Sequence, residues 1–229
     1  MCTVTILNHE TARVITMNRD EQKTRNAELP PTYYGESDVF APRDGNAGGT
    51  WIGVNDRGIF ACLLNSYVAK VSPANPPSRG FVIPAILKSA EPFSCVETND
   101  FSAYMPFRLI LGDSSHAFFY HWNGQHLSKE MLSLTNGVMI SSSSWQEQEV
   151  LAIRRAAFSA WQTAGSAFDE LGLPSIHRFQ PKGNAESGIL VSRPNTHTTS
   201  ITKITLTHDT PSPQMRYHPA QYLSPIASF

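Results

Sequence analysis

Polar and apolar residues alternate along the start of the chain with the period of two that is typical of β-strands. Residues 2–8 (CTVTILN) and 12–17 (ARVITM) both follow this pattern, with polar residues between them. The two segments predict a β-hairpin that begins at residue 2. Since a partner strand holds such an N-terminal strand, we expect these first residues to be ordered.

The same criteria predict strands at 51–54, 58–64, 107–111, 117–122, 137–140, 188–192, 198–206 and 215–218. Asn123 and Gly124 form a dipeptide that strongly favours a tight hairpin turn. Stretches rich in proline or glycine predict loops at 26–48 and 68–80.

One segment, residues 145–161, has the 3.6-residue period of an amphipathic helix. Val150, Ala157 and Trp161 fall on one face, and polar residues occupy the other. Weaker helical patterns cover 80–90 and 92–98. Strands outnumber helices and come in runs, without regular alternation with helices. This order predicts one α+β domain with antiparallel sheets, spanning 1–229.

Composition narrows the function classes. Apolar residues make up 41% of the chain, charged residues 16%, and the net charge is −1, so no basic surface is expected to bind nucleic acid. No apolar run reaches the ~20 residues that cross a bilayer, which predicts no membrane span. The N-terminus lacks the pattern of a secretory signal, so we expect a cytoplasmic protein.

Cysteine and histidine spacing argues against a metal or cofactor. The chain has three cysteines without a CxxC pair, which favours free thiols over disulfides or a zinc site. His116, His121 and His126 recur every five residues, a spacing that places neighbours on opposite faces of a strand. We expect no metal and no cofactor.

The N-terminal Met-Cys pair carries the candidate chemistry. Removal of Met1 would give Cys2 both a thiol and a free α-amine, whose ordinary pKa lies near ~8. Such an amine can act as general base for its own side chain. The alternative is that Cys2 is simply a small apolar residue in an edge strand.

Polar residues at two other strand ends could serve this thiol. The predicted hairpin places residues 17–20 beside residues 2–3, so Arg19 and Asp20 can reach Cys2. Asn65 ends the strand GIFACLLN, where its amide could donate to an oxyanion. The alternatives are a solvated turn at Arg19–Asp20 and an ordinary strand-ending asparagine at 65.

Several motifs together resemble the NRDE protein family, also called transport-and-Golgi-organisation-2-like. They are MCTVTIL at the start, NRDE at 18–21, APRD at 41–44, GGTWIGVNDRGIFACLLN at 48–65, SRG at 78–80 and PFRLILGD at 106–113. That family resembles the N-terminal-nucleophile (Ntn) hydrolases of the choloylglycine hydrolase and penicillin V acylase type. The resemblance implies a four-layer αββα sandwich of two antiparallel sheets flanked by helices.

The resemblance also implies roles for particular residues. Cys2 would be nucleophile and base, Arg19 and Asp20 its supports, and Asn65 an oxyanion donor. Ser142 stands where related enzymes have an active-site Asn. Relatives often carry an arginine before the last pair of strands, for which Arg193 and His197 are both candidates.

Two further residues are candidates for binding. Asn18 opens the NRDE run, and Trp51 follows two glycines at the start of a predicted strand, where it could line a cleft or fill the core.

These features predict a cysteine hydrolase that acts on a non-peptide carbon–nitrogen bond, with a small amide as its substrate. The alternative, implied by the family's eukaryotic members, is a non-catalytic carrier of a hydrophobic ligand such as a lipid or haem. The sequence leaves the oligomeric state open.

Overall fold

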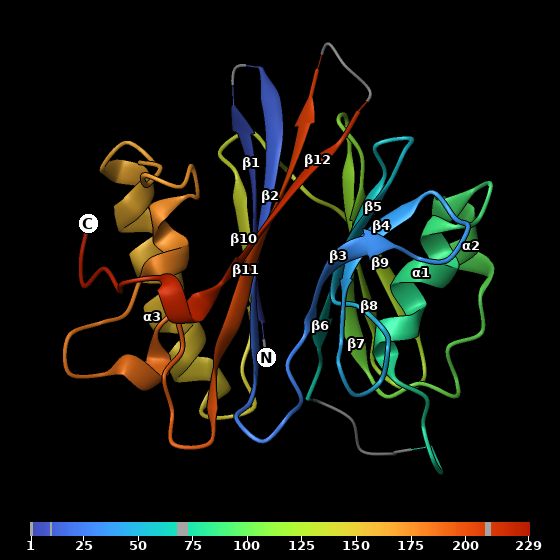
Figure 1. Cartoon of the computed structure of the whole chain (residues 1–229), viewed down its shortest axis with the longest axis horizontal. Helices are drawn as coiled ribbons and strands as arrows, with labels where there is room; N and C mark the ends of the chain where they lie inside the picture. Colours follow the sequence, from blue (N-terminus) through green and yellow to red (C-terminus); the bar gives the residue numbers. More distant parts are fainter. Residues whose placement is uncertain (1, 10, 68–72, 209–211) are drawn as a thin grey trace.

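Two antiparallel sheets form the centre of the molecule (Figure 1). The computed structural model describes residues 2–9, 11–67, 73–208 and 212–229. The first sheet has the order β10 (Val138–Ser142), β1 (Cys2–His9), β2 (Ala12–Gln22), β11 (Thr196–Thr207) and β12 (Gln214–Pro219). The second has the order β3 (Leu29–Tyr33), β4 (Val39–Arg43), β5 (Ile52–Asn55), β6 (Phe60–Asn65), β7 (Phe107–Gly112), β8 (Ala117–Trp122) and β9 (Leu127–Met131).

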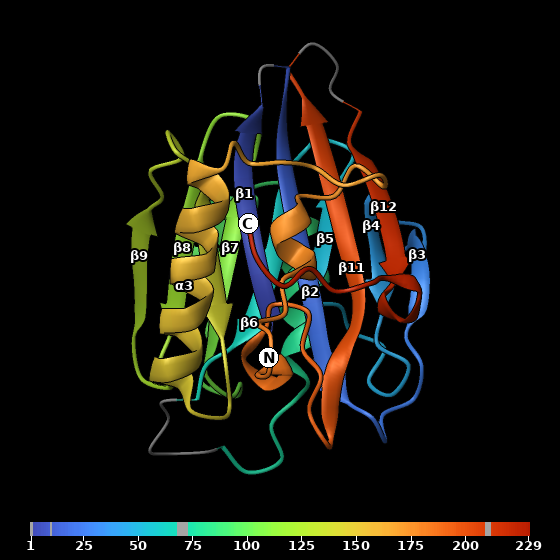
Figure 2. The same ribbon diagram turned by 90° about the vertical axis from the view of Figure 1, so that its left-hand side faces the viewer.

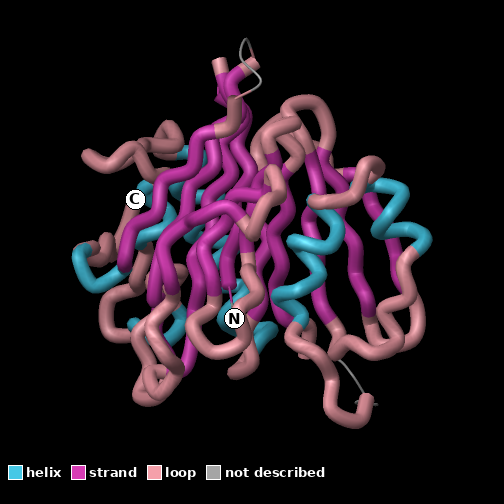
Figure 3. The backbone as a smooth tube through the Cα atoms, turned by 45° about the vertical axis from the view of Figure 1, so that its right-hand side comes forward, coloured by secondary structure: helices cyan, strands magenta, loops and turns pink. Residues whose placement is uncertain are grey.

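Helices cover the outer face of each sheet, which confirms the predicted αββα sandwich (Figure 3). α1 (Val82–Leu87) and α2 (Pro92–Thr98) pack on the second sheet. α3 (Glu147–Thr163) lies over the first, as Figure 2 shows from that side. In the described part of the chain, no helix is both long and apolar enough to span a bilayer.

Clusters of buried apolar side chains hold these layers together, and the three largest lie between the layers. One lies between the sheets and includes Ile6, Ile15 and Phe60, each fully buried. The others lie between α1, α2 and the second sheet, and between α3 and the first sheet. Since burial of an aliphatic side chain stabilises by roughly 1.5–3 kcal/mol, these clusters fix the relative positions of the layers.

The predicted N-terminal hairpin is present, and its register is the one the sequence suggests. Cys2 pairs with Arg19, and Thr3 pairs with Asn18. Because side chains alternate along a strand, Cys2 faces the second sheet and Thr3 faces α3. The hairpin therefore brings the NRDE run beside Cys2.

The prediction of a loop at 26–48 is wrong, because this segment contains β3 and β4. Its prolines suggested a loop, since proline lacks the backbone N–H that a ladder needs. Pro30 and Pro31 lie in β3, an edge strand, where proline is tolerated. Pro42 follows the two residues of β4 that pair with β5, Val39 and Phe40.

Two other details differ from the sequence prediction. The strand expected at 188–192 is instead irregular, since the N–H groups of Ile189 and Leu190 both donate to the Phe179 carbonyl. β9 was not predicted, because its residues are largely exposed and three of the five, Ser128, Lys129 and Glu130, are polar. Of the loop expected at 68–80, residues 68–72 lie outside the described residues.

His177 is a buried histidine that ties the layer around α3 to the first sheet. Its Nδ1–H donates to Asn18 Oδ1 (2.5 Å), and Nε2 accepts from the Thr5 hydroxyl (2.7 Å). The Asn18 amide in turn donates to the carbonyls of His177 and Ile189, which fixes the orientation of the amide. Burial lowers the pKa of His177 to about 3.

This histidine predicts acid sensitivity. Between pH 6.5 and about pH 3, this histidine is protonated in the unfolded chain and neutral in the folded one. The free energy of unfolding therefore decreases as the pH is lowered across that window, by at most ~1.4 kcal/mol per pH unit. We expect His177→Gln to flatten this dependence in urea unfolding measured from pH 7 to 4. His126→Gln, at an exposed position, should not; an unchanged slope in His177→Gln would contradict the prediction.

Candidate functional site

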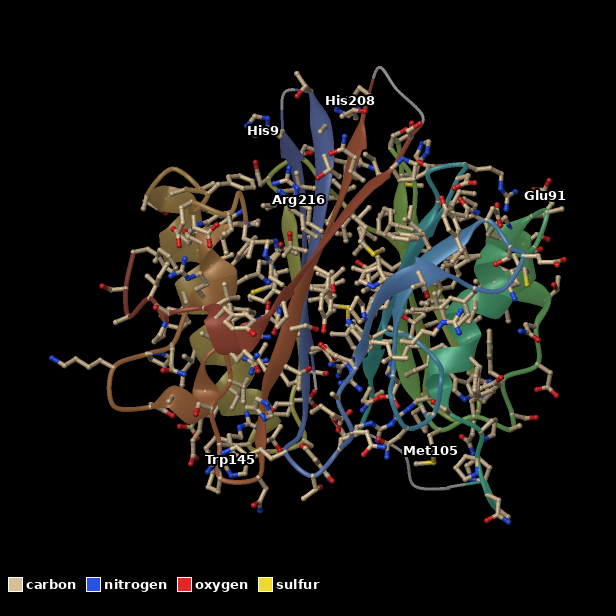
Figure 4. The ribbon with its side chains drawn as sticks, viewed as in Figure 1. His9, Glu91, Met105, Trp145, His208 and Arg216 are labelled. Atoms are coloured by element: carbon tan, nitrogen blue, oxygen red, sulfur yellow. The ribbon has the colours of Figure 1, made fainter. Side chains whose placement is uncertain are left out.

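Cys2 lines a cavity of about 280 Å³ at the end of the molecule where β1 begins. Figure 4 shows Trp145 at this end and His9 at the opposite end. The first sheet contributes Cys2, Arg19, Asp20 and Glu21 to the cavity wall. The second sheet and nearby loops contribute Thr50, Trp51, Leu63, Asn65 and Arg79, among others. The four residues predicted to be catalytic, Cys2, Arg19, Asp20 and Asn65, thus all line one cavity.

Cys2 is 7% exposed, and burial raises the pKa of its thiol above the ordinary value of 9.0. The positive charge of the N-terminus, a hydrogen bond from the Asp20 backbone and the charge of Arg19 oppose the rise, whereas the Asp20 carboxylate adds to it. The balance keeps the thiol protonated at neutral pH. A thiol in this state needs a base to become a nucleophile.

Asp20 is a deeply buried carboxyl group, 2% exposed. The Thr198 hydroxyl donates to its Oδ1 at 2.7 Å. Burial raises the pKa of Asp20, and the charges of Arg154 and Arg193 oppose the rise. Two guanidinium charges therefore act on the Asp20 carboxyl group, and the Asp20 backbone forms a hydrogen bond with the Cys2 thiol.

Arg154 was missed at the sequence level. It lies on α3 and is fully buried, where its Nη1 donates to Thr3 Oγ1 (3.0 Å) and Ser141 Oγ (2.6 Å). Burial lowers its pKa to about 10. The signal was available: position 154 is four residues from both Val150 and Phe158, on the apolar face of the helix.

The structure distinguishes the two candidates for the distal cation. Arg193 is 8% exposed and close enough to Asp20 for each charge to shift the pKa of the other. Its Nη2 donates to Ser143 Oγ (3.3 Å), and its guanidinium lies over the Trp145 ring (4.9 Å). His197 instead pairs with Glu21 across the β2–β11 ladder and lines a different cavity. Arg193 is therefore the residue near the acid.

Arg19 lies beside Cys2 and also forms ion pairs with carboxylates. Its guanidinium forms ion pairs with Glu28 (2.9 Å) and with Asp44, and lies 4.4 Å above the Trp51 ring. Arg25 binds the same Asp44 through two hydrogen bonds, and the pKa of Asp44 is lowered to about 2. Asp44, the last residue of the APRD motif, therefore fixes the side chains of Arg19 and Arg25.

The remaining predicted residues lie in different places. Asn65 ends β6 at the cavity wall, with its amide 3.3 Å from the Tyr67 hydroxyl. Trp51 lines the cavity too, and it also packs in the apolar cluster between the two sheets. Ser142 pairs with Cys2 across the β1–β10 ladder but does not line the cavity, and its buried hydroxyl has no partner among the described residues. Asn18 faces away from the cavity and has the structural role described above.

The GGTW and SRG motifs meet at one contact in the cavity wall. Thr50 N–H donates to the Gly80 carbonyl (3.0 Å), and a Cβ added at Gly49 would lie 2.6 Å from the Gly80 backbone. Only glycine allows this approach. The contact places Arg79 at the cavity, a residue for which the sequence suggested no role. Within the described ranges, no group of three or more His, Cys, Asp and Glu side chains could hold a metal ion.

Solved structures similar to this one include an amidase, an acylase and a hydrolase. An N-acylethanolamine-hydrolyzing acid amidase ortholog from Caenorhabditis elegans has a TM-score of 0.58 at 12% identity, over 89% of this chain and 92% of that one. Penicillin V acylase from Agrobacterium tumefaciens has a TM-score of 0.51 at 11% identity, over 97% and 87%. A mutant of conjugated bile acid hydrolase from Clostridium perfringens has a TM-score of 0.50 at 10% identity, over 98% and 94%. At these identities the similarity shows the Ntn-hydrolase fold alone.

Sequence comparison identifies the family. No curated protein matches the chain significantly. The sequence model of one family, Transport and Golgi organisation 2, matches residues 1–167, a range that contains Cys2, the NRDE run and Asn65. The chain belongs to the Transport and Golgi organisation 2 family.

Proposed function

We propose that this protein is an N-terminal-cysteine hydrolase that cleaves a non-peptide amide bond after Met1 has been removed. Met1 itself lies outside the described residues. The observation that carries the proposal is the cavity in which Cys2, Asp20 and Asn65 meet, on a fold shared with amide-cleaving enzymes. A buried thiol, a buried acid and an amide donor are the groups that such a reaction requires.

The mechanism begins with proton transfer from the Cys2 thiol to its own α-amine. The sulfur then attacks the amide carbonyl, and the Asn65 amide, with a backbone N–H, stabilises the oxyanion. The resulting α-ammonium gives its proton to the leaving amine, and the C–N bond breaks to leave a thioester on Cys2. The amine next takes a proton from water, and the hydroxide attacks the thioester. The C–S bond breaks to release a carboxylic acid, and the Cys2 thiolate takes the proton back from the α-ammonium.

The buried charges would stabilise the cationic intermediate. Proton transfer from a thiol to an amine creates a positive charge at the N-terminus, beside Asp20. A buried carboxylate offsets such a charge strongly because little solvent screens it. Burial raises the pKa of Asp20, and the charges of Arg154 and Arg193 oppose that rise, which favours the ionised carboxylate over the protonated one. These arginines are positioning residues rather than reacting groups.

Trapping the thioester tests the proposal. Purified protein should have a mass lower by one methionine, and brief mixing with butyryl-p-nitroanilide followed by acid quench should add one butyryl group per chain. Peptide mapping should locate it on Cys2. Retained Met1, or equal acylation of Cys2→Ala, would exclude the proposed chemistry.

Asn65→Ala should lower the rate of acylation without preventing assembly of the site. Loss of one oxyanion donor costs ~10²–10³-fold in kcat, with a small effect on KM. Asn75→Ala, at an exposed asparagine, is the matched control and should retain the full rate. Stopped-flow release of p-nitroaniline measures both. An unchanged kcat in Asn65→Ala would remove this residue from the oxyanion site.

A second cavity favours the lipid-carrier alternative. It has a volume of about 430 Å³, and Phe119, Leu132, Met139, Ile140 and Leu151 give it an apolar wall beside Arg108. Ligand sites of this size are commonly apolar with a few polar groups. Under this alternative, a fluorescent fatty acid would bind equally well to Cys2→Ala, whereas Leu151→Glu would abolish binding.

A further inference from the structure

Arg79 differs from the other arginines around the Cys2 cavity in its partners. Arg19 and Arg25 both form ion pairs with Asp44, and Arg154 and Arg193 lie near Asp20. Arg79 donates from Nη1 to the Pro106 carbonyl at 2.9 Å. Among the described residues, no carboxylate lies within ion-pair distance of Arg79.

The position of Arg79 is fixed by the fold. The Gly49–Gly80 contact holds the backbone on one side, and Ser78 Oγ accepts from Gly80 N–H (3.3 Å). The bond to Pro106 holds the side chain itself. A guanidinium held in this way loses little entropy when it binds a ligand, which raises the affinity it can supply.

Arg79 lies in the wall of the cavity. The residue is half-buried, and it is close enough to Tyr67, Cys2 and Glu21 for their charges to affect its guanidinium. Burial lowers its pKa, which is the cost of keeping a cation there without a carboxylate partner. A ligand anion would offset that cost.

We propose that Arg79 recognises a carboxylate on the substrate, so that the site selects anionic amides over neutral ones. The inference rests on the proposed function for the identity of the ligand as an amide. A planar guanidinium matches a carboxylate through two parallel N–H···O bonds. One nitrogen of Arg79 is used by Pro106, and the rest of the fork remains for the ligand.

Binding to matured Cys2→Ala tests this selection independently of turnover. The probes are two isosteric pairs: glutaryl-p-nitroanilide with its terminal carboxamide, and N-butyrylglycine with N-butyrylglycinamide. Calorimetry should give a dissociation constant roughly 10–100-fold lower for at least one carboxylate than for its carboxamide, because a charged hydrogen bond is lost in the carboxamide. Equal affinity within both pairs, or no binding at millimolar concentration, would overturn the proposal.

Variants assign the preference to this residue. Arg79→Met should remove the preference for the carboxylate probes. Arg79→Lys should retain part of this preference, and that result would show that the fold survives substitution at this position. Arg57→Met is the matched control, since Arg57 also donates to backbone carbonyls, those of Ser89 and Ala90, and does not line the cavity. A preference that persists in Arg79→Met would overturn the assignment.

The same measurements separate the two proposals. If Cys2 is not a nucleophile, wild type forms no thioester, yet the carboxylate preference of Cys2→Ala remains. If Arg79 instead serves the Cys2 thiolate, Arg79→Met slows thioester formation equally for the acidic and neutral members of each pair. That result would contradict substrate recognition and leave the hydrolase proposal intact.

Discussion

Arg154→Met is expected to lower the free energy of unfolding by roughly 3–5 kcal/mol at pH 7, because it removes a buried cation that opposes the Asp20 charge and donates buried hydrogen bonds. Methionine keeps most of the side-chain volume, so the loss is electrostatic rather than a cavity effect. Thr3 and Ser141 would lose a donor inside the protein, and Asp20 would keep a buried charge with one guanidinium fewer. Urea unfolding followed by tryptophan fluorescence measures the change.

The next residue of the same helix is the matched control. Arg155 is exposed, and Arg155→Met should change stability by no more than ~0.5 kcal/mol. Adding Asp20→Asn to Arg154→Met should restore part of the loss, because no buried carboxylate then lacks its counter-charge. Equal stabilities for the Arg154 and Arg155 variants would show that the buried guanidinium contributes nothing.

Local pattern predicted the hairpin and its register because the strand period is two. Once residues 2–8 and 12–17 were identified as paired strands, Arg19 had to lie near Cys2, and the structure has that pairing. The αββα layers followed from the family resemblance, and the comparisons confirm them. Apolar periodicity also located α3 to within two residues at each end.

Long-range charge pairing could not be predicted in the same way. Asp20 meets Arg154 and Arg193 only after α3 and the chain that follows it have packed on the first sheet. Asp44 fixes Arg19 across a segment whose prolines suggested a loop. No local pattern encodes contacts between residues so far apart in the chain. Arg154 could have been identified from the local pattern, because a charged residue on the apolar face of a helix indicates a buried polar partner.

Cys2→Ala is expected to reduce hydrolysis of butyryl-p-nitroanilide by roughly 10³-fold or more. Removal of a nucleophile leaves only binding and oxyanion contacts, which cannot form the thioester. Alanine is also small enough for Met1 to be removed, so the variant keeps a free α-amine. The measurement is the steady-state release of p-nitroaniline. Cys95→Ala, on α2 and away from the cavity, should keep the full rate.

A glycine inserted between Met1 and Cys2 separates the role of the amine from that of the thiol. The inserted residue converts the Cys2 amine into a peptide N–H, which cannot accept a proton, and leaves the thiol in the sequence. Burial raises the pKa of this thiol, so little thiolate forms at pH 7 unless a base takes the proton. We therefore expect the extended protein to be as inactive as Cys2→Ala. A full rate in the extended protein would mean that another group takes the proton, and the N-terminal-nucleophile mechanism would fail even though Cys2 reacts.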